Sequence, residues 1–267
     1  MSPTKIGYAV ADGVATHTLD DPPANTYSYE MMQELDAAVL TARMDAAVHV
    51  LVITGAGDRF FCAGANIGML KDADPAFKYY FCLHANETLN RLEQTPKLVI
   101  AALNGHTVGG GLEVAMAADI RIARHGGGRI GMPEVALGVL PGTGGTQRFA
   151  RLVGKAKAIE TIALGSLFSF EQARDLGLVN HVWGEADLAG RTFAQAVHEY
   201  ARQFTPPNKA SKAVGHIKRA VQSGLEVGFH EGLALERELQ QRLFESEDAR
   251  EGIAANLEKR KPEFHGR

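Results

Sequence analysis

Apolar residues recur with two different periods along the chain, and the changes between them predict alternating strands and helices. Short runs rich in β-branched residues, bounded by glycine, proline or aspartate, are typical of buried strands. Apolar residues three or four positions apart, such as Leu35, Val39 and Ala42, instead indicate an amphipathic helix. We predict an opening hairpin around Asp12-Gly13. Further predicted elements are strands over 6–10, 14–19, 48–54, 98–103 and 178–183 and helices over 76–93, 112–118 and 146–153.

The pattern changes near residue 185, beyond which only helices are predicted. Just before this change, Ser169 and Gln172 form the S-x-x-Q pattern of a helix capping box. We therefore predict an α/β core with the active site over residues 1–204 and a helical region over 205–267. The apolar residues of that region recur near helical spacing, which predicts contacts between subunits.

Composition narrows the class of protein. The 267 residues are 45% hydrophobic and 22% charged with a net charge of −3, so there is no basic bias toward nucleic acid or anionic membranes. No stretch approaches the roughly 18 uncharged residues needed to cross a bilayer. The two cysteines, Cys62 and Cys82, lack metal spacing and are too few for a disulfide framework. We expect both to be small core residues of a soluble, cytoplasmic protein.

A glycine-rich stretch between residues 105 and 134 holds the strongest chemical signal. Three glycines at 109–111 lie where a predicted strand meets a predicted helix. Glycine allows close approach of the backbone to a ligand, and a helix begins with unpaired N–H groups at its positive dipole end. Glu113 lies one turn inside this helix, and Glu134 follows a turn stiffened by Pro133. We predict two carboxylates beside a backbone that accepts negative charge, including charge that develops only during reaction.

Several familiar motifs are incomplete. The turns beginning at Gly55 and Gly142 lack the third glycine of a dinucleotide fingerprint, and no G-K-[ST] phosphate loop occurs. The segment HGGG at 125–128 resembles the oxyanion segment of lipases, yet no G-x-S-x-G elbow supplies a serine. The ten histidines show no metal-binding spacing, so we expect no metal site.

The residues alone leave two interpretations of Glu113 and Glu134 open. A carboxylate buried in an apolar setting is costly unless it is paired or used in chemistry. The two glutamates could therefore form structural ion pairs, or they could be a catalytic pair. Spacing along the chain does not show whether they face each other.

Five segments in sequence carry a family resemblance over nearly the whole chain. They are FCAGANI at 61–67, ALNGHTVGGGLE at 102–113, IGMPEVALGVLPGTGGTQR at 130–148, ARDLGLV at 173–179 and EKRKPEF at 258–264. Together they resemble the crotonase family, and most closely its enoyl-CoA hydratases. The resemblance implies a spiral of repeated ββα units and a C-terminal helical region that mediates trimerisation, commonly with two trimers in a hexamer.

The resemblance also implies roles for single residues. The backbone N–H groups of Ala65 and Gly110 would form an oxyanion hole for the thioester oxygen. Glu113 would be the general base for attack of water at the β-carbon, and Glu134 would exchange the proton at the α-carbon. The residues expected to bind the substrate, largely through backbone, are Ala63, Ala65, Asn66, Ile67, Gly68 and Gly110.

The chain departs from the family pattern at three places. Asn66 stands where the family usually has aspartate, and Met132 replaces a frequent polar residue. The loop at 125–128 makes the spacing between the two glutamates one residue longer. The first two departures bear on the acyl group accepted. The four aromatic residues that we expect near the acyl pocket are Phe77, Tyr79, Tyr80 and Phe81.

The sequence thus favours an enoyl-CoA hydratase whose coenzyme A enters with the substrate, without a separate cofactor. An enoyl-CoA isomerase or acyl-CoA hydrolase of the same family is an alternative, although many such relatives lack one glutamate. A non-catalytic CoA-binding or RNA-binding protein is the alternative from another class. Its support is a basic stretch without acidic residues over 206–225, which includes Lys209, Lys212 and Lys218.

Overall fold

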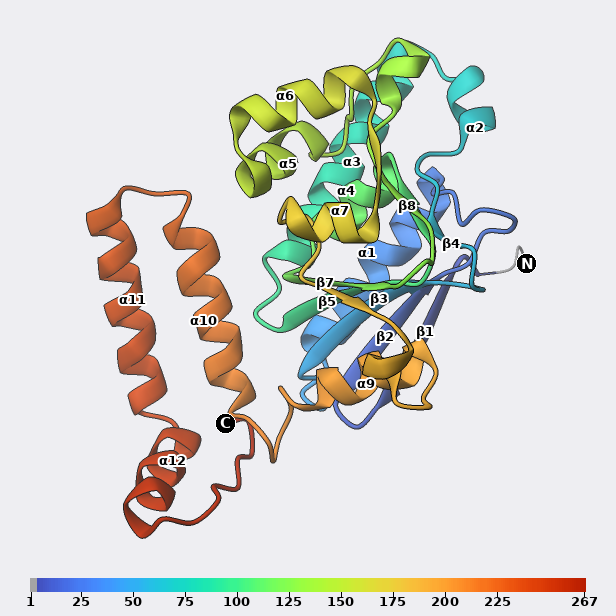
Figure 1. Cartoon of the computed structure of the whole chain (residues 1–267). Helices are drawn as coiled ribbons and strands as arrows, with labels where there is room; N and C mark the ends of the chain where they lie inside the picture. The colour runs from blue at the N-terminus through green and yellow to red at the C-terminus, as the bar shows by residue number, and fades with distance from the viewer. Residues whose placement is uncertain (1–3) are drawn as a thin grey trace.

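A repeating pattern of two strands and a helical segment builds the first part of the structure (Figure 1). The computed structural model describes residues 4–267, and it confirms the predicted α/β fold class. The four units are β1 Ile6–Ala11, β2 Val14–Leu19 and α1 Tyr29–Met44; β3 Val50–Gly55, β4 Phe60–Cys62, α2 Ile67–Lys71 and α3 Pro75–Glu93; β5 Leu98–Leu103, β6 His106–Val108 and α4 Gly110–Met116; and β7 Ile120–Arg124, β8 Arg129–Gly131, the 3-10 helix η1 Glu134–Leu137 and α5 Gly145–Val153.

The rest of the chain is mainly helical, as the pattern beyond residue 185 predicts. Two short strands occur before that point, and α8 to α12 follow it. The elements are α6 Lys155–Leu164, β9 Leu167–Ser169, α7 Phe170–Asp175, β10 His181–Trp183, α8 Glu185–Leu188, α9 Phe193–Arg202, α10 Ser211–Gly224, α11 Phe229–Phe244 and α12 Glu247–Glu258.

The strands form two sheets, and successive units contribute to both. The larger sheet has the order β1-β2-β3-β5-β7-β10 and the smaller has the order β4-β6-β8-β9. From the second unit onward, the first strand of each unit joins the larger sheet and its second strand joins the smaller one. Because β4, β6 and β8 pair in parallel, their carboxyl ends lie at the same edge of the smaller sheet. Three successive loops therefore leave the sheet at one place.

Both faces of the larger sheet are buried, which explains why its central strands are apolar throughout. In β3, Leu51 and Ile53 pack in the main core with α1 and α3, whereas Val50 and Val52 pack in a second cluster with Phe193 of α9. This alternation follows from the two-residue period of a strand. The predicted strand over 98–103 is confirmed with the same bounds as β5.

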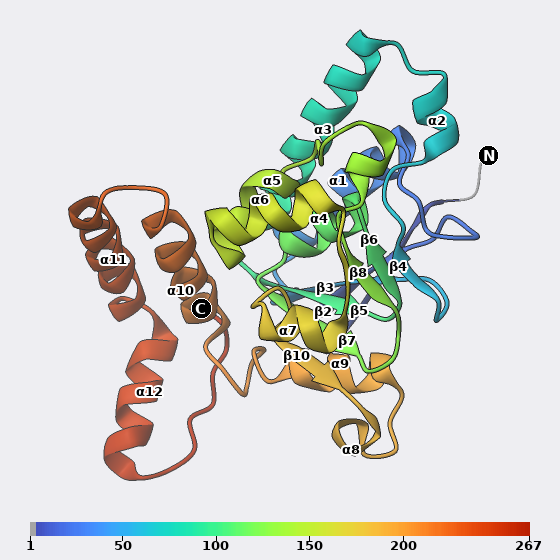
Figure 2. The same cartoon turned by 45° about the horizontal axis from the view of Figure 1, so that its top comes forward.

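Three helices at the C-terminal end lie to one side of the two sheets in both views (Figures 1 and 2). The helix α10 packs against α11 and is anchored to the core by Lys218, whose Nζ lies 2.9 Å from Oδ2 of Asp119. The same Nζ donates to the carbonyl of Lys97. Lys218 is thus committed to an internal ion pair, and the basic stretch over 206–225 presents one cation fewer than its sequence suggests.

The local predictions succeed where a motif fixes the backbone. The hairpin is confirmed, with Asp12 and Gly13 both at positive φ, and the capping box of Ser169 and Gln172 is formed. The predicted strand over 178–183 is too long, because only His181–Trp183 pairs with the sheet. Within residues 4–267, no helix is long and apolar enough to cross a membrane.

Candidate active site

A cavity of about 270 Å³ lies where the loops after β4, β6 and β8 meet. Among the residues singled out from the sequence, the cavity is lined by Ala63, Ala65, Ile67, Gly110, Glu113 and Glu134. Residues up to 71 positions apart are therefore brought together, as the family resemblance implies. Asn66 and Gly68 do not line this cavity. The side chain of Asn66 instead caps α2, with its Oδ1 accepting from the N–H of Met69 at 3.0 Å.

One wall of the cavity is backbone. Neither the N–H of Ala65 nor that of Gly110 has a hydrogen-bond acceptor within the part of the chain that the structure describes. Gly64, at φ +90°, lets the two segments meet, because a Cβ there would lie only 3.0 Å from the nitrogen of Gly110. Gly110 begins α4, where N–H groups are unpaired and the helix dipole is positive. The wall thus offers two N–H donors to an oxygen that carries negative charge.

Glu113 is buried and held by three hydrogen bonds from the loop that leads into α5. Its Oε1 accepts from the N–H of Thr143 at 2.7 Å and from the N–H of Gly145 at 2.8 Å, and its Oε2 accepts from the hydroxyl of Thr143. Gly145 is the first residue of α5, so the dipole of that helix also favours a negative carboxylate. Oε1 is saturated by its two donors, whereas Oε2 keeps acceptor capacity for a further group.

Tyr27 extends this network. Its hydroxyl oxygen lies 3.2 Å from Oγ1 of Thr143. Because the Thr143 hydroxyl donates to Glu113, its oxygen accepts the proton of the Tyr27 hydroxyl. Burial raises the pKa of Tyr27 well above its usual value, so the phenol is neutral and can donate. The chain of hydrogen bonds fixes the orientation of the Glu113 carboxylate.

Glu134 has a different environment. It begins η1 directly after Pro133, and its Oε2 is buried without a hydrogen-bond partner within residues 4–267. Burial, and to a lesser extent the charge of Glu113, raises the pKa of Glu134 to about 7, against a smaller opposing effect of Lys78. Near neutral pH, Glu134 is therefore able both to give and to take a proton, while Glu113 is held as an acceptor.

Three residues that the sequence reasoning missed take part in this site. Thr143 and Tyr27 position Glu113, and Lys78 lines the cavity. The loop PGTGG at 141–145 was a usable signal for Thr143, since such a loop feeds a helix N-terminus. The four aromatic residues expected near the acyl pocket do not line the cavity, because Phe81 faces the core and Tyr79 and Tyr80 are exposed. Met132 is fully buried in the core.

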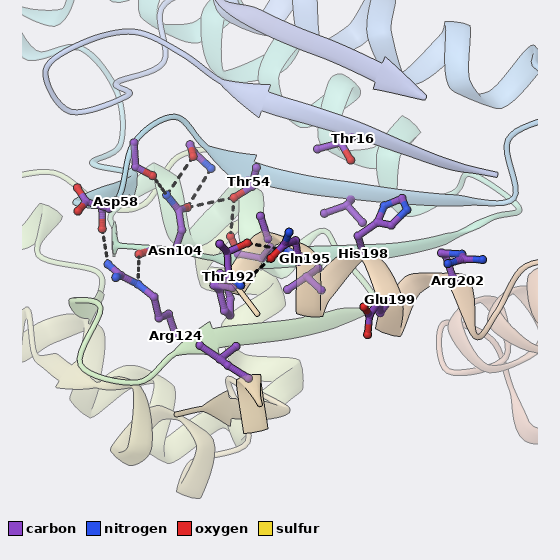
Figure 3. Close-up of a pocket in the computed structure, with 18 residues that line it drawn as sticks. Thr16, Thr54, Asp58, Asn104, Arg124, Thr192, Gln195, His198, Glu199 and Arg202 are labelled. Carbon is purple, nitrogen blue, oxygen red and sulfur yellow. Dashed lines mark hydrogen bonds between the residues drawn. The ribbon is translucent and has the colours of Figure 1, made fainter. Parts of the chain in front are cut away.

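A larger cavity of about 770 Å³ lies between the larger sheet and α9 (Figure 3). Its polar groups mostly bond to the protein itself. Arg124 donates to the carbonyl oxygens of Asn104 and Asp58, and the Asn104 side chain holds the turn after β3 through Gly55 and Gly57. Neither Glu113 nor Glu134 reaches this cavity. The chemistry that the two glutamates can perform therefore belongs to the smaller cavity.

Comparison with known proteins agrees with this geometry. The sequence model of the enoyl-CoA hydratase/isomerase family matches residues 9–267. A probable enoyl-CoA hydratase of Bacillus subtilis is 38% identical, with 98% of each chain covered. A short-chain-enoyl-CoA hydratase of Clostridium acetobutylicum is 36% identical over 94% of this chain and 93% of its own. The crystal structure of an enoyl-CoA hydratase from Geobacillus kaustophilus superposes with a TM-score of 0.94 at 42% identity, covering 100% of this chain and 98% of the other.

Proposed function

Because the chain belongs to the enoyl-CoA hydratase/isomerase family, we propose that it is an enoyl-CoA hydratase, which adds water reversibly to a 2-enoyl-CoA to give a 3-hydroxyacyl-CoA. One observation carries this proposal: two carboxylates of different character line a cavity whose backbone wall holds two free N–H donors. Addition of water needs a proton acceptor, a proton donor and stabilisation of an enolate, and this arrangement offers all three.

The thioester oxygen would bind to the N–H groups of Ala65 and Gly110. As water attacks the β-carbon, electrons move through the double bond onto this oxygen, and the two donors stabilise the charge where it develops. One such donor is typically worth about 2.7 to 4 kcal/mol of transition-state stabilisation. Coenzyme A is part of the substrate, and the reaction requires no separate cofactor.

The two glutamates would divide the proton transfers. Glu113, kept as an acceptor by its three donors, takes a proton from the attacking water through Oε2. Glu134, with its pKa of about 7, gives its proton to the α-carbon, and both steps run backwards in dehydration. A group with a pKa near the working pH is best suited to such exchange.

The same cavity bears on the alternatives. An isomerase would use one carboxylate to move a proton, and a hydrolase would release free CoA. The presence of both glutamates in one cavity favours hydration over either. A role in binding RNA loses support, because Lys218 of the basic stretch is buried in an ion pair with Asp119.

The test compares wild type with Glu113→Gln and Glu134→Gln on a 2-enoyl-CoA in heavy water. We expect one deuterium at the α-carbon of each hydrated product. Each variant should lose about 10²- to 10⁴-fold in turnover with thioester binding largely kept, because an amide is nearly isosteric but accepts no proton. Full activity of the Glu113 variant, or free CoA as the main product, would contradict the proposal.

The oxyanion hole needs its own experiment. Replacing Gly110 is uninformative, because any Cβ there would collide with the hydroxyl of Tyr27. Replacing Ala65 with lactic acid, by incorporation of an α-hydroxy acid, exchanges its N–H for an ester oxygen and keeps the methyl group. The ester variant should lose about 10²- to 10³-fold in kcat. The same exchange at Ala189, whose N–H donates to the carbonyl of Glu185 outside the cavity, is the control.

A further inference from the structure

Lys78 is a cation on the wall of the proposed acyl cavity. It belongs to α3 and lines the cavity together with the apolar side chains of Leu70, Leu137 and Leu140. It is half-buried, and within residues 4–267 it forms no ion pair with any carboxylate. Among the residues that the structure describes, no other lysine or arginine lines this cavity.

The ammonium group of Lys78 lies near a buried aromatic ring of the same helix. Its Nζ lies 5.4 Å from the ring centroid of Phe81, a residue that is only 1% exposed. Lys78 is also close enough to Glu134 to lower the pKa of that carboxyl. The charge of Lys78 therefore acts on a carboxyl group that lines the cavity.

Lys78 lines the cavity without an ion-pair partner among residues 4–267, so its charge is available to an anion that enters the cavity. Glu134 is not this anion, because its Oε2 has no hydrogen-bond partner and makes no ion pair with Lys78. We propose that Lys78 binds a carboxylate at the far end of the acyl chain, so that the preferred substrates are 2-enoyl-CoA thioesters of dicarboxylic acids. This inference rests on the proposed hydratase function and names its substrate class.

The chemistry of the cavity favours a carboxylate over the phosphates of coenzyme A. Phosphate groups carry more charge and are usually held by several donors, whereas this cavity offers one cation in an apolar wall. Its volume of about 270 Å³ is also slightly below the roughly 300 to 1,000 Å³ of ligand pockets. A short acyl chain with a single terminal charge matches both features.

The experiment compares two thioesters of equal length, 2-hexenoyl-CoA and 2-hexenedioyl-CoA, which differ only in a terminal methyl or carboxylate. Five- and eight-carbon pairs extend the comparison to other chain lengths. Wild type should favour the carboxylated member of at least one pair in kcat/KM. Lys78→Met should lower kcat/KM for that member by roughly 10- to 100-fold and leave the neutral member within about threefold. Lys71→Met, at an exposed position outside the cavity, is the matched control and should change neither.

Pantetheine thioesters separate a carboxylate from a phosphate as the anion. These thioesters lack the phosphate groups of CoA. If Lys78→Met still lowers kcat/KM only for the carboxylated pantetheine thioester, the result supports binding of the acyl carboxylate by Lys78. Loss with every CoA thioester but with no pantetheine thioester would assign Lys78 to phosphate and overturn the inference. An equal loss of kcat/KM for neutral and carboxylated chains, measured at the pH optimum of each variant, would assign Lys78 to Glu134 and overturn the inference as well. Preference of wild type for the neutral chain in every pair would refute the substrate class while the hydratase function stands, whereas no hydration of any thioester would end both proposals.

Discussion

Thr143 binds both carboxylate oxygens of Glu113. Its backbone N–H lies 2.7 Å from Oε1, and its hydroxyl donates to Oε2. Both residues are buried, so water does not compete for these bonds. The carboxylate plane is thus set by a residue 30 positions further along the chain. If Glu113 is the general base, the orientation of its carboxylate toward the attacking water depends on Thr143.

Thr143→Val should therefore impair activity without removing a catalytic group. The variant keeps the backbone bond but loses the hydroxyl, and a hydrogen bond to a charged group is worth about 1.5 to 3 kcal/mol. We expect kcat/KM for a neutral enoyl thioester to fall roughly 10- to 100-fold. Thr143→Ser keeps the hydroxyl and should stay within a few-fold of wild type. Equal activity of the valine and serine variants would show that the hydroxyl does not orient the base.

The pH profile should report the proton on Glu134. Hydration needs Glu113 ionised and Glu134 protonated, so activity is lost as pH rises through the Glu134 pKa of about 7. Hydration releases no net proton, so the ratio of kcat/KM for hydration to kcat/KM for dehydration does not depend on pH. Both reactions should therefore lose activity over the same range of high pH. Pantetheine thioesters avoid titration of the CoA phosphate. Since Lys78 lowers this pKa, Lys78→Met should move the limb to higher pH. A flat profile from pH 6 to 8.5 would contradict the role of Glu134.

The ion pair of Lys218 and Asp119 should be a major link between α10 and the core. The side chain of Lys218 is 4% exposed, and removing one partner of a buried pair typically costs about 3 to 5 kcal/mol. Lys218→Met should lower the free energy of unfolding by that order in urea titrations. Lys212→Met, an exposed change on the same helix, should stay within about 0.5 kcal/mol. Adding Asp119→Asn to Lys218→Met should recover part of the loss, whereas additive losses would argue against direct coupling.

The exposed apolar side chains of α10 and α11 predict assembly. Val221, Leu225 and Phe229 lie open on this surface, with Leu225 79% exposed. We expect a trimer or hexamer in light scattering at micromolar concentration. The double change Val221→Asp and Leu225→Asp should dissociate it. Met44→Asp changes an equally exposed residue on α1 and should not. A monomeric wild type would refute the assembly.

The sequence predicts most of the secondary structure because the relevant signals are local. The run over 98–103 is apolar on both faces, so its strand is unambiguous. The strands β4, β6 and β8 have only three residues each, too few to show a two-residue period. The sequence indicates these three strands only indirectly, through the glycine-containing turns beside them.

The chemistry of the site divides in the same way. The burial of Glu113 follows from the apolar helix around it, and its position next to Glu134 was implied by family resemblance. The contact with Thr143 joins distant segments, so no local pattern reveals it. The sequence did not single out Lys78, which lies among four aromatic residues of α3. Tertiary packing decides which face of a helix lines a cavity, so the sequence of α3 alone does not show it.

The placement of the functional loops has a consequence for how the protein becomes active. Ala65 follows β4, Gly110 follows β6 and Glu134 follows β8, so three consecutive units each supply one part of the cavity at an equivalent position. A folding intermediate whose fourth unit has not docked would lack Glu134 and the two backbone donors of Thr143 and Gly145 that hold Glu113, so it could not complete a turnover. Recovery of enzymatic activity during refolding therefore reports the docking of the fourth unit. It should lag behind the recovery of helix content measured by far-UV circular dichroism.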